Sequence, residues 1–130
     1  MVDTLDTYPV TPTKNHTNVM IAEIKAGGTC YPEAANYLLG CAHEDAILVH
    51  GRPTLRVAPF IEYSHAWVEI GDEVIDPSSG FVGSKILYYA VGNIRDSDNH
   101  TYTKDTMLAY LLSYGHYGPW EGPEAVGTLL

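Results

Sequence analysis

The chain has 130 residues, a length at which a single domain buries its own core without cross-links. It carries 16 acidic and 7 basic residues, for a formal net charge of -9, and such a charge repels nucleic-acid phosphates and anionic lipid headgroups. We therefore expect neither nucleic acid nor a membrane surface as a direct partner. No apolar run approaches the roughly 18 residues that cross a bilayer, and the first residues lack a signal-peptide pattern. We expect a soluble, cytoplasmic protein.

The N-terminal third of the chain predicts an irregular arm followed by two helices. Residues 1–17 are rich in Thr, Pro and Asn with little periodicity, so we treat them as an arm outside a single domain of residues 18–130. Apolar residues between 19 and 24 follow a helical spacing that two glycines then end. A second helix is predicted over 29–40, because Pro32 and the glutamate after it suit a first helical turn.

The middle of the chain changes to a period of two, which is typical of strands. Strands are predicted over 46–51, 54–60 and 85–92, and a hairpin over 64–80. A helix follows over 103–115, after which the tail is loop-like. The predicted fold class is therefore α+β, with N-terminal helices packed on a small, mainly antiparallel sheet.

The predicted hairpin places a histidine close to an aspartate. A two-residue turn at 71–72, with glycine first, suits a type II′ turn, and counting back from it puts Trp67 opposite Asp76. His65 then shares a face with Asp76 as its diagonal neighbour, at a spacing one hydrogen bond can close. Singly, a strand histidine or an Asp-Pro turn is usually structural. Together they predict a base and the carboxylate that orients it.

Cys30 is the candidate nucleophile for this pair. The chain has two cysteines, too few for a disulfide framework, so each is expected to be a free thiol. Cys30 lies at a predicted helix start, where the helix dipole and unpaired N–H groups favour a thiolate and can also hold an oxyanion. Cys41 follows the end of the same helix, and we assign it to packing.

Two segments carry a resemblance to a known family. The stretches GGTCYPEAANYLL and HAWVEIGDEVIDPSS, between about Gly27 and Gly80, resemble the transglutaminase-like branch of the papain-like cysteine hydrolases. The resemblance implies Cys30 as nucleophile, His65 as general base and acid, and Asp76 as its orienting partner. Trp67 would be a wall of the site or a core anchor, and we favour the second.

One feature departs from the family pattern. Papain-like enzymes commonly place a glutamine before the cysteine as an oxyanion donor, and this chain contains no glutamine. Asn15 and Asn18 are the candidates to replace it, with the backbone N–H of Cys30 as the first donor. Losing one such donor typically lowers the rate by about 10²–10³, so weak or absent activity is an open alternative.

The predicted function is a cysteine hydrolase that acts on a peptide or other amide through a thioester, with no cofactor and a peptide or protein as partner. If an amine resolves the thioester, the protein is a transglutaminase or another acyltransferase, and the residues leave both open. A third reading is a binding module that keeps the fold without the chemistry. A metal site is the weakest reading, because the available ligands lack zinc-site spacing; they are Cys30, Cys41, His43, His65 and Asp76.

Two further features near the C-terminus and on a strand complete the prediction. The aromatic loop GHYGPW, residues 115–120, is a candidate cap for the site. His50 lies on a predicted strand, and we assign it a packing or solvated role. The tyrosines at 88 and 89 are expected mainly to pack the core.

Overall fold

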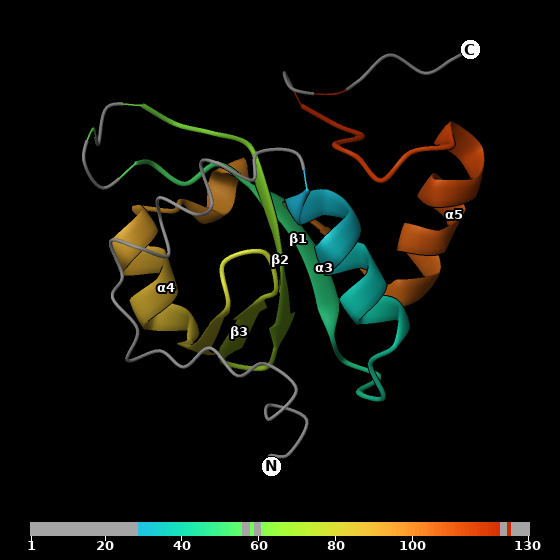
Figure 1. Cartoon of the computed structure of the whole chain (residues 1–130), viewed down its shortest axis with the longest axis horizontal. Coiled ribbons are helices and arrows are strands. Elements are labelled where there is room, and N and C mark those ends of the chain that lie inside the picture. The colour runs from blue at the N-terminus through green and yellow to red at the C-terminus, as the bar shows by residue number, and fades with distance from the viewer. Residues whose placement is uncertain (1–28, 56–57, 59–60, 123–124, 126–130) are drawn as a thin grey trace.

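The computed structural model describes residues 29–55, 58, 61–122 and 125. It shows a mixed α+β fold built on one five-stranded antiparallel sheet with the strand order β4-β3-β2-β1-β5 (Figure 1). Within these residues no helix is long and apolar enough to cross a membrane. The elements are α3 (Cys30–Leu39), β1 (Ile47–Gly51), β2 (His65–Ile70), β3 (Glu73–Asp76), β4 (Phe81–Ser84), α4 (Lys85–Gly92), the 3₁₀ turn η1 (Asp96–Asp98), β5 (His100–Tyr102) and α5 (Lys104–Tyr114).

The sheet separates two apolar clusters, because neighbouring residues of a strand point to opposite faces. On one face Leu48 and Val68, both fully buried, pack in a cluster with residues of α3 and α5. On the other face Val49 and Trp67 pack in a second cluster, against which Tyr88 of α4 lies. The helices therefore cover both faces of the sheet, and each strand contributes alternately to the two cores.

The two helices with clear end signals form where the sequence predicts them. α3 begins at Cys30, and the residue after its end is Gly40, whose backbone N–H bonds back into the last turn. α5 begins with a capping box in which the hydroxyl of Thr103 accepts from Thr106, and it ends at Gly115 in the left-handed conformation with φ of 76°. Both predictions are confirmed.

The hairpin register is also confirmed. Gly71 has φ of 59°, as a type II′ turn requires of its first central residue. The structure pairs Ile70 with Glu73 and Val68 with Ile75, as the count from the turn predicts. This register decides which side chains of β2 and β3 share a face.

The strand predicted over 85–92 is wrong, because these residues form α4. The Ser84 hydroxyl accepts a hydrogen bond from the Leu87 N–H at 3.3 Å, as an N-cap does, and Asn93 ends the helix with φ of 51°. The near-continuous apolar run fits a buried strand and a helix equally well. The two cap residues distinguish the helix from the strand.

The strand predicted over 54–60 is not formed by the residues that the structure describes. Thr54 makes only an isolated bridge with Glu62, and its N–H donates to the Gly92 carbonyl at 2.8 Å, at the end of α4. The sheet instead gains the unpredicted edge strands β4 and β5. The arm predicted for residues 1–17 and the helical pattern over 19–24 lie outside the described residues.

Candidate active site

His65 and Asp76 form a buried hydrogen-bonded pair. His65 is the first residue of β2 and Asp76 the last of β3, and His65 Nε2 lies 2.7 Å from Asp76 Oδ2. Their side chains are only 2% and 1% exposed. The hairpin register therefore brings together the two residues that the sequence places on one face. Because Nε2 faces the carboxylate, Nδ1 is the ring atom through which His65 would act on a nucleophile.

Asp76 is held as a carboxylate by several donors. The Tyr88 hydroxyl donates to Oδ2 at 2.6 Å, and Oδ1 accepts from the Ser78 hydroxyl at 3.0 Å and from the Ser79 N–H at 3.4 Å. Burial by itself would raise the pKa of Asp76, but the charge and hydrogen bond of His65 and the hydrogen bonds from Tyr88 and Ser79 outweigh it. The net pKa is lowered, so the carboxylate is ionised at neutral pH and fixes the imidazole.

Tyr88 is the residue that the sequence analysis missed. It was expected to pack the core from a strand, whereas helix α4 carries it over the face of the sheet that holds Asp76. Its ring also lies 5.3 Å from the ring of Trp67. The signal that could have found it is the pair of caps at Ser84 and Asn93, which converts the apolar run into a helix.

A second buried carboxylate lies two residues after Trp67, on the same face of β2. Glu69 accepts from the Trp67 indole N–H at 2.9 Å and from the Tyr89 hydroxyl, and Lys85 Nζ lies 3.2 Å from its other oxygen. Trp67 is fully buried, so it lies in the core behind His65. Glu69 thus anchors the last part of β2 to α4, as Asp76 anchors its beginning.

Cys30 lies at the same end of the sheet but on the other face. It is the first residue of α3, is 5% exposed and belongs to the cluster on the α3 side, whereas the His65 ring packs beside Trp67 on the α4 side. The hydroxyls of Tyr31 and Ser64 are hydrogen-bonded, so the chain neighbours of Cys30 and His65 touch. Figure 1 shows α3 beginning at the end of the sheet where β2 begins. Among the described residues, however, none is hydrogen-bonded to the Cys30 thiol.

The remaining predicted residues are placed as follows. Asn15 and Asn18 lie outside the described residues. Cys41 is half-buried against the cluster that contains Cys30. No three His, Cys, Asp or Glu side chains in the described part of the chain lie close enough together to hold a metal ion. The candidate ligands of the metal-site hypothesis therefore do not form a cluster there.

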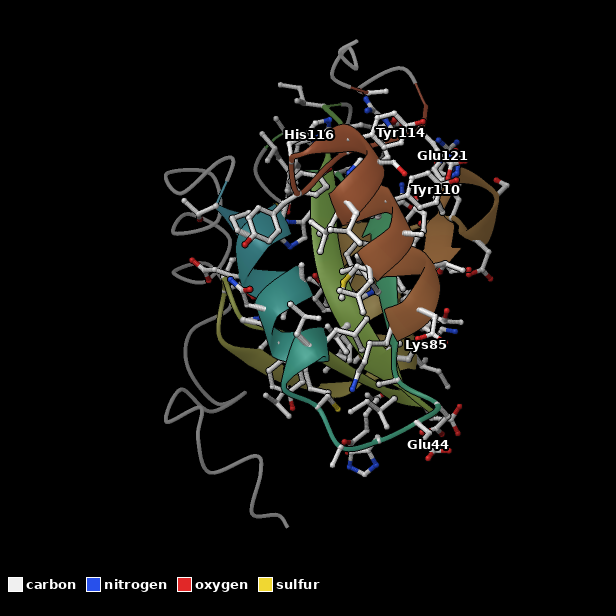
Figure 2. All side chains as sticks on the ribbon, turned by 90° about the vertical axis from the view of Figure 1, so that its right-hand side faces the viewer. Glu44, Lys85, Tyr110, Tyr114, His116 and Glu121 are labelled. Carbon is white, nitrogen blue, oxygen red and sulfur yellow. The ribbon has the colours of Figure 1, made fainter. Side chains whose placement is uncertain are left out.

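A pocket adjoins the beginning of α3 and of β2. It is lined in part by Tyr31, Ser64 and Pro119 and has about 280 Å³ of empty space, which includes open solvent. Residues 115–120 lie against it, because a Cβ built on Gly118 would be 3.4 Å from Tyr31 Cδ1. Figure 2 shows His116 at the same end of the molecule, beyond the last turn of α5. The loop therefore neighbours the residue that follows Cys30.

Comparisons of the chain with models of protein families, with curated proteins and with solved structures found no match. What this site can do is therefore argued from its own chemistry. That chemistry is a carboxylate-oriented imidazole and, on the other face of the sheet, a thiol at a helix start, which are the types of group that acyl transfer uses.

Proposed function

We propose that the protein is a cysteine-dependent hydrolase of the papain-like, transglutaminase-like type, with Cys30 as nucleophile and His65 and Asp76 as its base and orienting acid. The observation that carries this proposal is the buried 2.7 Å hydrogen bond between His65 and an ionised Asp76. A buried imidazole fixed in this way has one defined tautomer, with Nε2–H donating to the carboxylate and Nδ1 able to accept a proton.

The reaction follows from these positions. His65 Nδ1 takes the proton of the Cys30 thiol, and the sulfur attacks the carbonyl carbon of a peptide or other amide. The oxyanion is held by N–H groups at the start of α3, and the carbon–nitrogen bond breaks as His65 returns the proton to the leaving amine. Water then attacks the thioester with His65 as base, which releases a carboxylic acid and regenerates the thiol.

The proposal requires one movement. The Cys30 side chain must pass the end of β2 to reach His65 Nδ1, because α3 packs on the face opposite to the His65 ring. Catalytic hydrogen bonds are often long before substrate binds and tighten in the complex. The contact between Tyr31 and Ser64 already holds the two chain segments together.

A binding module without chemistry is the second candidate. It is favoured by the Cys30 thiol, which has no hydrogen bond to the part of the chain that the structure describes, and by a chain that contains no glutamine for an oxyanion hole. The two candidates differ in one property, since only the hydrolase forms a covalent bond between an acyl group and Cys30.

The test uses p-nitrophenyl acetate, an activated ester that needs no specific pocket. We expect a burst of p-nitrophenol and an intact mass increased by one acetyl group, located at Cys30 by peptide mapping. Cys30→Ala and His65→Ala should abolish the burst, and the control Cys41→Ala should retain it. Equal, slow acetylation of both cysteines would leave the binding module as the better account.

The same acyl-enzyme distinguishes hydrolysis from acyl transfer. We expect the acetyl group to be lost to water, so that adding glycine methyl ester leaves the decay rate of the Cys30 adduct unchanged. A decay rate that rises with the amine concentration and yields the acetylated amine would identify an acyltransferase.

A further inference from the structure

His50 is a second buried histidine at the same end of the sheet. It lies on β1 and is only 4% exposed. Three aromatic rings surround it, with centroids 4.8 Å away for Tyr31, 5.0 Å for Tyr102 and 5.0 Å for Trp120. The imidazole is therefore enclosed by an aromatic cage on the face of the sheet that carries α3 and α5.

Neither ring nitrogen of His50 has a hydrogen-bond partner among the described residues, although both are fully buried. A buried polar atom without a partner destabilises a protein, so such an atom in a native fold needs an explanation. Burial, with the nearby His100 and His65, lowers the pKa of His50 to about 3. The ring is therefore neutral at pH 7 and offers one N–H donor and one acceptor nitrogen.

His50 lines the pocket described above, and two charged residues of the lining, Arg52 and Asp98, are already ion-paired. Arg52 pairs with Glu62 at 3.1 Å, and Asp98 pairs with Arg95 at 2.9 Å. The pocket lining therefore combines the ion-paired Arg52 and Asp98 with an imidazole whose two nitrogens have no hydrogen bond to the described residues.

Glu121, which also lines the pocket, has hydrogen-bonding partners but no ion pair with Lys or Arg among the described residues. It accepts a hydrogen bond from the Tyr102 hydroxyl at 2.9 Å, and its other oxygen lies 3.5 Å from His100 Nδ1. Figure 2 shows Glu121 beside Tyr110 at the end of α5, away from Lys85.

We propose that this pocket binds an uncharged hydrogen-bonding group of the substrate, a hydroxyl or a primary carboxamide that does not itself react, through the imidazole of His50. The inference rests on the proposed function, because Tyr31 follows Cys30 and Ser64 precedes His65, so the pocket borders the place where the carbonyl would react. Its cavity volume of about 30 Å³ leaves room for a small polar group such as a hydroxyl or an amide.

A neutral polar group fits better than the alternatives. A carboxylate would lose its hydration against aromatic rings and a neutral imidazole without gaining a counter-charge. An ammonium only donates hydrogen bonds, so it would leave the imidazole N–H unpaired. An apolar group would leave the ring nitrogens unpaired. A site with buried hydrogen-bonding groups discriminates strongly against ligands that cannot satisfy them.

The test measures binding in the full-length Cys30→Ala variant, which cannot form an acyl-enzyme. The probes are N-acetyl methylamides of serine, asparagine, lysine, glutamate and leucine, and the readout is the ¹⁵N shift of the His50 ring nitrogens. The ring signals are assigned through contacts to Trp120 and Tyr102. We expect saturable shifts with the serine or asparagine probe and at least about tenfold weaker binding of the other three.

A matched variant, His50→Phe, keeps a ring in the cage and should abolish binding of the preferred probe while thermal unfolding confirms the fold. Absence of any His50 shift with all five probes, preferred binding of lysine or glutamate, or unchanged affinity in His50→Phe would overturn the proposal. Because the readout does not depend on turnover, an inert Cys30 with intact probe binding would reject only the proposed function. An acetylated Cys30 without probe binding would reject only the pocket.

Discussion

His65 and His50 are almost equally buried, yet their surroundings give them opposite properties. His65 faces an ionised carboxylate that Tyr88 also holds, whereas the His50 ring packs against aromatic rings and its nitrogens have no hydrogen bond to any residue the structure describes. The difference comes from register, because β1 pairs His50 with Ala66, so the two histidines point to opposite faces of the same sheet. Burial alone therefore does not decide what a histidine can do. A carboxylate on the neighbouring strand makes one of them a candidate base, and its absence leaves the other neutral.

The largest expected effect is on the paired histidine. Asp76→Asn keeps the shape of the side chain but removes the charge that fixes the His65 tautomer, so the rate of p-nitrophenol release should fall by about 10²–10⁴-fold. Stopped-flow absorbance measures this rate. Asp72→Asn, in the exposed hairpin turn, is the matched control and should stay close to wild type. Equal rates of p-nitrophenol release in the two variants would show that Asp76 does not contribute to the reaction.

The unpaired histidine should make the fold sensitive to acid. Since burial lowers the pKa of His50 from 6.5 to about 3, the unfolded chain binds a proton there between these pH values and the folded protein does not. Stability is complete above pH 6.5 and should fall by about 1.4 kcal/mol for each pH unit below it. His50→Phe should remove this slope, as measured by urea unfolding at about pH 7 and pH 5. Identical slopes in wild type and variant would show that His50 is protonated or solvated in the fold. Asp76 does not interfere, because its pKa is lowered from 3.8.

Gly51 of β1 is adjacent to both histidines and is tightly packed. Gly51 follows His50 and pairs with His65, and a Cβ there would lie 2.4 Å from Asn99 Oδ1 and 2.5 Å from Trp67 Cη2. Gly51→Ala should therefore destabilise the fold by about 1–3 kcal/mol in denaturant unfolding.

The control for this substitution is Gly40→Ala at the end of α3, where the nearest heavy atom would be 3.8 Å away and φ is -89°. It should change stability by no more than about 0.5 kcal/mol. Similar losses in the two variants would mean that Trp67 and Asn99 can move away from the strand.

The smallest predicted effect concerns the second donor to Asp76. Tyr88→Phe removes one hydrogen bond to the carboxylate and should lower stability by about 1 kcal/mol and the burst rate by up to about tenfold. Tyr89 is on the same helix as Tyr88, and Tyr89→Phe removes a comparable hydrogen bond to Glu69 of β2. It should lower stability without slowing the burst. If the burst is slowed equally in both variants, Tyr88 contributes only to the stability of the fold.

The pairing of His65 with Asp76 could be predicted because it depends on local rules. A Gly-Asp turn fixes the register of one hairpin, and alternation then places both side chains on one face. The start of α3 at Cys30 was predictable in the same way, from residues adjacent in the chain. Each of these features needs only a few neighbouring residues.

The rest depends on contacts between distant segments. The aromatic rings around His50 come from α3, β5 and the loop after α5, and no spacing of residues in the sequence predicts that they meet. Tyr88 reaches Asp76 only because residues 85–92 form a helix, which their apolar run leaves undecided. The position of Cys30 relative to His65 likewise depends on how α3 packs across the sheet.

The central claim is that His65, oriented by Asp76, activates Cys30, and alkylation by iodoacetamide at about pH 6 tests it most directly. Mass spectrometry follows both thiols in one sample, so half-buried Cys41 serves as an internal control. We predict that Cys30 reacts at least about tenfold faster than Cys41 and that His65→Ala removes the difference. Equal, slow alkylation of the two cysteines, unchanged by His65→Ala, would contradict the account.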